Sequence, residues 1–226
     1  TPRYLESNGL YRKLTREFPE IVRGDGCYLW DERGRRYLDA CGGAFVANIG
    51  HGVREIADAL AAQASRIAYV NGTAFTTEPV ESLARELAAL TPGDLDHIYF
   101  LASGSEAVEA ALKLARQYWV ERGRPLKQEI ISLAPGYHGN TLLALSASAR
   151  PHYATFFREW IVSVHRIPAP LAYRCECRRT DATCAVCSGA ALEAKILEVG
   201  ADRVAAFIAE PVGGSSTGAS VPRADY

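Results

Sequence analysis

The sequence predicts an α/β protein: a mostly parallel sheet with helices on both faces, preceded by a small N-terminal α+β segment. From about residue 53, short apolar runs alternate with amphipathic stretches, which is the pattern of strands connected by helices. The 226 residues are 48% hydrophobic, enough to bury a sizeable core. Residues 1–50 have a different, hairpin-like character, and we expect them to form a separate, smaller unit.

The expected elements follow in chain order. Residues 27–40, CYLWDERGRRYLDA, read as two short strands around the turn 31–34. Helices are expected at 53–70 and 78–93, the second ending at Pro92 and Gly93. Beyond them the pattern predicts strands at 97–101, 129–134, 161–168 and 204–211, helices at 104–122 and 189–200, and a short helix within 134–148.

Three small residues mark the junction between the strand at 97–101 and the helix that follows. Ser103, Gly104 and Ser105 would expose unpaired amides at the positive end of the helix dipole, which favours a bound phosphate. A plain helix cap explains the same residues, because Ser is a favoured capping residue. The chain contains neither GxxxxGK[ST] nor GxGxxG, which argues against nucleoside-triphosphate and dinucleotide loops.

Two further strand ends carry polar groups. After the strand at 129–134, Tyr137 and His138 lie in a small, kinked turn; the aromatic ring could stack on a planar ligand, or simply be half-buried in a loop. Glu210 ends an apolar strand just before Pro211, where a carboxylate needs a partner. That partner could be a ligand, a helix N-terminus that Glu210 caps, or an Arg side chain.

Taken in order, these segments resemble one family. SGSEAVEAALKLAR, GYHG and AEPVGG, preceded by YLWDERGRRYLDACGGAFVANIGHG, are similar to the class III (omega) aminotransferases, which use pyridoxal 5'-phosphate and have fold type I. The resemblance runs from about residue 20 to the end of the sequence. In terms of that family, residues 1–50 belong to the small domain, and 51–226 form the first part of the large domain that binds the cofactor.

The resemblance implies a role for each matching residue. Gly104 and Ser105 would hold the cofactor phosphate by their amides, with help from the Ser105 hydroxyl. Tyr137 would stack on the pyridine ring and His138 would support that wall. Glu210 would lie beside the cofactor and steer the groups around it. Three residues match the segment that lines the substrate side of the pocket: Gly43, Ala44 and Phe45.

The resemblance also implies that this chain is catalytically incomplete. In the family, the aspartate that pairs with the pyridine nitrogen and the lysine that forms the Schiff base both lie downstream of the Glu-Pro strand. Lys13, Lys113, Lys127 and Lys195 match no family lysine. We therefore expect no catalytic residue in this chain, and expect the missing groups to come from the rest of a longer chain or from a second polypeptide.

The expected activity is transfer of an amino group from an amine or amino acid to a 2-oxo acid. The resemblance also implies a homodimer. Two alternatives stay open: an aminomutase or racemase of the same fold, and a non-catalytic half that acts as an interaction module. The formal net charge of -1 does not favour nucleic acid or an anionic membrane surface. No apolar run approaches the roughly 20 residues of a spanning helix, and we expect a cytoplasmic protein.

Cysteines form a separate pattern. Cys27 and Cys41 are isolated, and we expect them to be small packing residues. The other four lie in a CxC followed by a CxxC, within an insert near residues 173–188: Cys175, Cys177, Cys184 and Cys187. Four closely spaced thiolates can close on one tetrahedral zinc ion. Reduced thiols without metal are the alternative, and a disulfide is the least expected in a reducing compartment.

Overall fold

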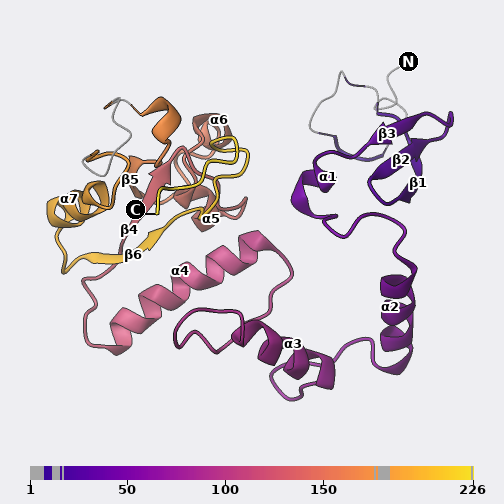
Figure 1. The fold of residues 1–226 in the computed structure, drawn as a ribbon. Coiled ribbons are helices and arrows are strands. Elements are labelled where there is room, and N and C mark those ends of the chain that lie inside the picture. The colour runs from indigo at the N-terminus through magenta and orange to yellow at the C-terminus, as the bar shows by residue number, and fades with distance from the viewer. Residues whose placement is uncertain (1–7, 12–15, 17, 176, 178–183, 225) are drawn as a thin grey trace. The chain divides into compact units, whose positions relative to one another are not determined.

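The computed structural model describes residues 8–11, 16, 18–175, 177, 184–224 and 226. The chain divides into two compact units, one ending at His97 and the other beginning at Ile98 (Figure 1). Each unit is described by itself. The division into domains at residue 50 stays a prediction. Among the described residues, no helix combines the length and the hydropathy needed to cross a membrane.

The first unit contains a three-stranded antiparallel sheet. Its strands β1 (Ile21–Asp25), β2 (Tyr28–Asp31) and β3 (Arg36–Leu38) are arranged in that order. The expected hairpin is confirmed as β2 and β3. Strand β1 was not predicted, because IVRGD has apolar residues only at its first two positions and lacks the alternation typical of a strand.

Asp31 organises the turn between β2 and β3. Its carboxylate is buried and accepts hydrogen bonds from the Arg33 and Arg35 amides, the Arg35 side chain and the Tyr37 hydroxyl. Burial alone would raise the pKa of Asp31, but the bonds from Tyr37 and Arg35 outweigh it and hold the pKa at about 2. The turn closes at Gly34, which has a φ of 75°.

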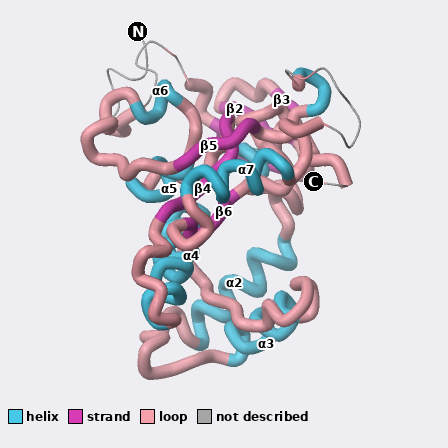
Figure 2. Tube along the Cα trace, turned by 90° about the vertical axis from the view of Figure 1, so that its left-hand side faces the viewer, coloured by secondary structure: helices cyan, strands magenta, loops and turns pink. Residues whose placement is uncertain are grey.

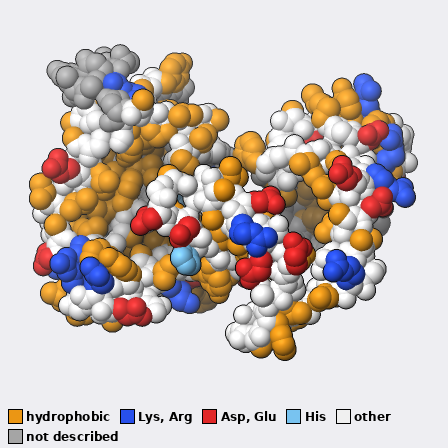
Figure 3. All heavy atoms as spheres, turned by 60° about the horizontal axis from the view of Figure 1, so that its bottom comes forward, with side chains coloured by type: hydrophobic (Ala, Val, Ile, Leu, Met, Phe, Trp, Pro, Cys, Tyr) orange, Lys and Arg blue, Asp and Glu red, His pale blue; other side chains and the backbone are white. Residues whose placement is uncertain are grey.

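Two amphipathic helices follow the sheet in the first unit. Helix α2 (Arg54–Arg66) and helix α3 (Glu78–Ala88) confirm the two expected helices, and each is shorter than predicted. Neither helix buries a residue, although the structure describes every residue of both. Apolar side chains such as Leu60 and Leu83 are exposed, and Figure 3 shows apolar side chains on the surface of each unit.

The second unit is built on a parallel sheet. Strands β5 (His165–Pro168), β4 (Glu129–Ala134) and β6 (Val204–Ile208) lie side by side in that order (Figure 2). The core consists of Ile131 and Leu133 of β4, Ile167 of β5 and Val204 of β6. Against it pack apolar side chains of helix α7 (Ala190–Val199).

The alternation of side chains along β4 shows that helices cover both faces of this sheet. Ile131 and Leu133 belong to the core that packs against α7. Ser132, between them, points to the other face and donates a hydrogen bond of 2.8 Å to the Ala147 carbonyl of helix α5 (Leu142–Ala147). The long helix α4 (Gly104–Glu121) contacts β6, where the Trp119 indole donates to the Ala205 carbonyl. A short helix α6 (Pro151–Ala154) and a 3₁₀ turn η2 (Ala172–Arg174) complete the unit.

Three strand predictions need correction. Residues 97–101 form no strand, because no described segment pairs with them, and Tyr99 is 78% exposed. The strand expected at 161–168 begins only at His165, since the Val162 amide donates to the Ser146 hydroxyl instead of to a neighbouring strand. The strand expected at 204–211 ends at Ile208, two residues before Glu210.

Candidate functional site

The first turn of α4 is open to an anion. Ser103 caps the helix, and its hydroxyl accepts a 3.2 Å hydrogen bond from the Glu106 amide. Within the described part of the chain, the amides of Gly104 and Ser105 have no acceptor. A Cβ placed on Gly104 would meet nothing within 4 Å. The cap is therefore Ser103, and the next two residues leave their amides accessible at the positive end of an 18-residue helix.

The loop after β4 docks directly on this turn. The Asn140 amide donates a 2.9 Å bond to the Ser105 hydroxyl, which leaves the hydroxyl proton free to point elsewhere. Gly139 permits the approach, because a Cβ there would lie 2.7 Å from the Ser105 Oγ and 2.9 Å from the Ala144 Cβ. One turn further along α4, Glu109 accepts from the Thr141 hydroxyl at 2.6 Å and from the Ala144 amide at 3.2 Å.

Glu210 joins the loop after β6 to the loop after β4. Its carboxylate accepts a 3.2 Å bond from the Tyr137 amide and another from the Ser216 hydroxyl. The sequence analysis named a helix N-terminus and an arginine as possible protein partners of Glu210. The partners in the structure are instead a loop amide and a hydroxyl. The Tyr137 side chain is 42% exposed, and the Arg150 guanidinium lies 5.9 Å from the centre of its ring.

His138 is anchored through its backbone amide, and its side chain contains a buried nitrogen. Its amide donates a 2.8 Å bond to the Ser148 hydroxyl. Its Nε2 atom is buried and has no partner among the described residues. Burial lowers the pKa of His138, with Arg166 acting in the same direction and Glu210 opposing it, so the imidazole is neutral at neutral pH. The described contacts of the chain leave this buried nitrogen unsatisfied.

Arg166 is a residue of the site that the sequence analysis missed. From β5 it donates to the Ser132 hydroxyl and to three carbonyls at the end of α5, those of Ser146, Ala147 and Ser148. Burial lowers the pKa of Arg166. The guanidinium therefore holds the end of α5, and through Ser148 it holds His138. The sequence signal that could have indicated this role is a charged residue within the otherwise largely apolar stretch IVSVHRIP, residues 161–168.

These contacts connect the ends of two strands and one helix. The structure brings Gly104, Ser105, Tyr137, His138 and Glu210 to the carboxyl side of the parallel sheet, where ligands bind in open α/β folds. Open amides at a helix N-terminus suit a phosphate, and a half-exposed aromatic ring suits a planar group. The residues present fit a phosphorylated aromatic cofactor.

The segment predicted to line the substrate side lies in the first unit. Gly43, Ala44 and Phe45 fall within α1 (Gly42–Phe45), whose residues all have positive φ values, including 63° at Ala44 and 69° at Phe45. A left-handed turn costs an ordinary residue about 1–2 kcal/mol. Such strain concentrates at functional sites. A place for this turn beside the cofactor residues stays a prediction.

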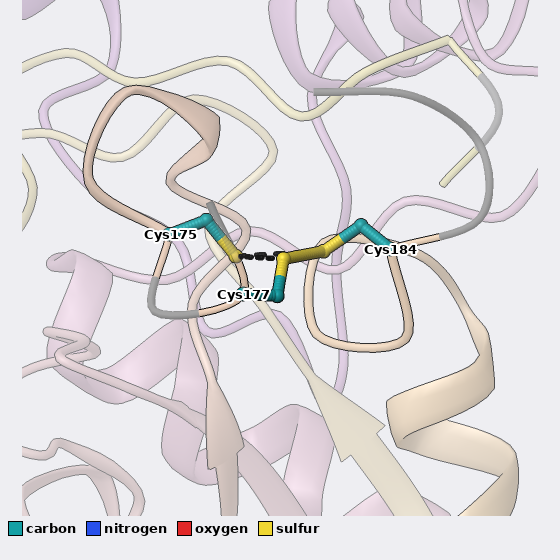
Figure 4. Close-up of side chains that lie close together, drawn as sticks. All are labelled: Cys175, Cys177 and Cys184. Atoms are coloured by element: carbon teal, nitrogen blue, oxygen red, sulfur yellow. Dashed lines mark hydrogen bonds between the residues drawn. A yellow bond between two sulfur atoms is a disulfide. The ribbon is translucent and has the colours of Figure 1, made fainter. Parts of the chain in front are cut away.

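Cysteines of the insert gather around one point. The Sγ atoms of Cys175, Cys177 and Cys184 all lie within 4.8 Å of one another (Figure 4). The fourth, Cys187, is buried and donates its amide to the Cys184 sulfur at 3.2 Å. Burial raises the pKa of the Cys187 thiol to about 11, with Cys175 adding to the rise. We call these four residues the cysteine cluster.

Two cysteine expectations differ from the structure. Cys177 and Cys184 are joined by a disulfide, the state that the sequence analysis expected least. Their sulfur atoms lie close enough to bond, and whether the bond persists depends on the redox poise of the compartment. Cys27 and Cys41 are exposed rather than packed, because they flank the small antiparallel sheet of the first unit and not the buried core.

Comparisons with known proteins agree with this architecture. The family model described as Aminotransferase class-III matches residues 12–226. An uncharacterized aminotransferase of Schizosaccharomyces pombe is 39% identical over 210 residues, which cover 92% of this chain and 46% of that protein. This chain thus spans about half the length of the curated relatives it matches.

Two solved structures extend the likeness to three dimensions. An (S)-enantioselective omega-transaminase from Thermomicrobium roseum superposes with a TM-score of 0.91 at 35% identity, over 99% of this chain and 51% of that one. An amine transaminase from an uncultivated Pseudomonas species, in its pyridoxal-phosphate-bound form, gives 0.84 at 33% identity, over 97% and 50%.

Proposed function

This chain belongs to the class III aminotransferase family, and from that premise we propose that it is the N-terminal half of a pyridoxal 5'-phosphate-dependent aminotransferase. The proposed reaction moves an amino group from an amine or amino acid to a 2-oxo acid. The observation that carries the proposal is the meeting of the first turn of α4 with the loops after β4 and β6, which are linked through Ser105 and Glu210.

In this proposal the first turn of α4 binds the cofactor phosphate. The amides of Gly104 and Ser105 donate to phosphate oxygens, aided by the helix dipole. The Ser105 hydroxyl already accepts from the Asn140 amide, so its own proton is free for a phosphate oxygen. Gly104 supplies the room, since its backbone has no side chain in the way.

Tyr137 and His138 form the wall for the ring. The half-exposed ring of Tyr137 stacks on the pyridine face, and Arg150 lies over the same tyrosine. His138 supports this wall through its amide bond to Ser148 and places a neutral nitrogen at the site. Glu210 holds the Tyr137 amide and sets the position of the wall relative to the end of β6.

Pyridoxal phosphate, when bound, supplies the electron sink that makes amino-group transfer possible. None of the four lysines of this chain matches a family lysine, so we propose that the lysine that tethers the cofactor comes from outside this sequence. Lys127 donates to the Ala201 and Val204 carbonyls at the amino end of β6, away from Glu210. Lys195 pairs with Glu198 on α7, and Lys13 lies outside the described residues. We therefore place the lysine and the pyridine-pairing aspartate in the remainder of a longer protein or in a second polypeptide.

The resemblance further leads us to propose a cytoplasmic homodimer, with Gly43, Ala44 and Phe45 on the substrate side of the pocket. The cysteine cluster takes no part in the transfer. Small amines and 2-oxo acids such as pyruvate are the proposed substrates.

The test uses the full-length protein that carries these residues. Borohydride reduction followed by intact-mass analysis should reveal one phosphopyridoxyl group, and a panel of amines should yield new amino acid only when pyruvate or 2-oxoglutarate is added. Amino-group movement or racemisation without an oxo acid would identify an aminomutase or racemase instead. Absence of any adduct and of any new absorbance on adding the cofactor would contradict the proposal and leave an interaction module.

Tyr137 offers a sharper version of this test. Tyr137→Phe keeps the ring and should retain cofactor affinity within about threefold, whereas Tyr137→Leu removes the stacking surface and should weaken it about tenfold. Equal affinities of the two variants would show that the ring does not stack on the cofactor.

A further inference from the structure

The cysteine cluster lies outside the proposed amino-group chemistry, yet its geometry is that of a metal site. In tetrahedral zinc sites each Zn–S bond is about 2.3 Å, which places ligand sulfurs about 3.8 Å apart. The Cys175 sulfur lies 2.9 Å from that of Cys177 and 3.4 Å from that of Cys184, and all three are within 4.8 Å of one another. Small movements of the side chains would bring them to the edges of one tetrahedron.

The second half of the motif offers a fourth sulfur, that of Cys187, which lies outside the group of three whose Sγ atoms are within 4.8 Å of one another. Cys187 follows Cys184 in a CxxC and is 3% exposed, and Cys175 contributes to the raised pKa of its thiol. Its amide also donates to the Cys184 sulfur, a contact that stabilises a negatively charged thiolate. The cluster therefore combines four sulfurs with a backbone donor aimed at one of them.

Two groups around the cluster suit a metal-bound, negatively charged site. The Tyr226 hydroxyl is buried without a partner among the described residues, and it interacts electrostatically with Cys187. The Arg223 guanidinium also interacts electrostatically with Cys187 and would offset the charge of four thiolates on one divalent ion.

We propose that the cysteine cluster, in its reduced form, binds one Zn²⁺ ion that fixes the loop between β5 and α7. Four thiolates select zinc over harder divalent ions, and four protein ligands leave no open position for substrate or water. The site is therefore structural. This inference is independent of the amino-group transfer proposed above.

Zinc binding requires the Cys177–Cys184 disulfide to be opened. A dithiol reductant supplies two electrons and two protons, becomes a cyclic disulfide, and leaves two thiols in the protein. Zn²⁺ then displaces the thiol protons of the cluster, which pass to solvent. No other oxidant or reductant is needed.

The first experiment measures zinc in untagged, full-length protein purified under reducing conditions without chelator. Elemental analysis should find about one zinc ion per chain assigned to this cluster, lost in Cys175→Ser and in Cys187→Ser. Cys27→Ser is the matched control, an exposed cysteine of the same chain outside the cluster, and should keep its zinc. Equal zinc content in wild type and all three variants would overturn the proposal.

A second experiment does not depend on variants that fold. The wild-type protein is stripped with a mercurial reagent, reduced, and titrated with Co²⁺, which should give the thiolate charge-transfer band and intense d–d bands of a tetrahedral site. Protein alkylated immediately on cell lysis should yield peptides in which Cys177 and Cys184 carry the alkyl label, which shows that they were thiols and not a disulfide. A disulfide-linked peptide together with no cobalt spectrum after reduction would show a redox pair instead. Both readouts are independent of cofactor binding, so they fail or succeed separately from the aminotransferase proposal.

Discussion

Loops that follow the three parallel strands are held in two different ways. Those after β4 and β6 are joined to each other and to α4 through oxygen and nitrogen atoms, at Glu210 and Ser105. In the loop after β5, the contacts between the described residues 175 and 187 run through sulfur, at Cys175, Cys184 and Cys187.

The loops after β4 and β6 belong to the proposed binding surface, whereas the loop after β5 is cross-linked through its cysteines. The hydrogen-bonded loops and the first turn of α4 leave groups accessible: the open amides of Gly104 and Ser105, and the half-exposed ring of Tyr137. The sulfur-linked loop turns its reactive groups inward, with Cys184 and Cys187 buried. We therefore expect a substitution that disrupts the hydrogen-bonded loops to leave the sulfur-linked loop intact, and the reverse.

Arg166 should give the largest effect on the hydrogen-bonded loops. Arg166→Met removes the donor to three carbonyls at the end of α5 and leaves buried acceptors unpaired, which should lower the free energy of unfolding by about 3 kcal/mol. Chemical denaturation of the full-length protein measures this change. Arg203→Met is the control: its ion pair with Glu129 is exposed at the arginine end and should cost less than about 1 kcal/mol. Equal losses in the two variants would contradict the role of Arg166.

Gly139→Ala should have the second largest effect and lower the free energy of unfolding by about 2 kcal/mol. The added Cβ would collide with Ser105 and Ala144, and the φ of Gly139 is 146°. Cofactor affinity should fall with it, since the loop is pushed away from α4, while zinc content stays unchanged. Gly214→Ala, in the loop after β6, meets nothing within 4 Å and should change stability by less than about 0.5 kcal/mol. A Gly139→Ala protein with wild-type stability and affinity would show that the close approach to Ser105 is not required.

Two serines on either side of Gly104 distinguish helix capping from cofactor binding. Ser103→Ala removes the helix cap and should cost about 1 kcal/mol of stability with little change in cofactor affinity. Ser105→Ala removes the acceptor of the Asn140 amide and a phosphate donor, so it should cost about 1 kcal/mol and weaken cofactor binding about tenfold. Denaturation curves and spectroscopic cofactor titration distinguish them. Equal cofactor affinities in the two variants would remove Ser105 from the site.

The smallest expected effect is that of the cysteine cluster on cofactor binding. Cys175→Ser should lose zinc yet keep cofactor affinity within about twofold, because the hydrogen bonds of Cys175 and Cys187 given above run between the cysteines themselves. Cofactor titration of the variant, at a temperature where circular dichroism shows it to be folded, measures this. A tenfold loss of affinity would mean that the sulfur-linked loop and the hydrogen-bonded loops form one unit.

Local patterns predicted most of the architecture. The apolar run EIISLA correctly predicts β4, and the apolar face of 104–122 predicts α4 to within one residue. The equally apolar residues 97–101 are predicted as a strand but pair with no described segment, because pairing depends on a neighbour that periodicity cannot reveal. Strand β1 was missed for the opposite reason: it is paired but has no alternation.

The candidate site was predicted in its parts but not in its connections. The residue types at three strand or helix ends, together with the family resemblance, pointed to Ser105, Tyr137 and Glu210. The bond between the Tyr137 amide and Glu210 spans 73 residues of sequence, and no local pattern predicts it. Arg166 acts from a strand that carries no motif, so its role required the position of α5.

The most direct test of the central claim places a negative charge where the phosphate is expected. Gly104→Asp adds a side chain in open space, and a carboxylate in the first turn should stabilise α4 by up to about 1 kcal/mol. The same carboxylate should repel a phosphate at close range, by about 3 kcal/mol or roughly 100-fold in affinity.

The measurement compares the affinity of full-length Gly104→Asp and Gly104→Asn proteins for pyridoxal phosphate, alongside their unfolding free energies. The account predicts an Asp variant at least as stable as the Asn variant but about 100-fold weaker in cofactor binding. Equal affinities of two equally folded variants would contradict it, and would show that the phosphate does not bind at the first turn of α4.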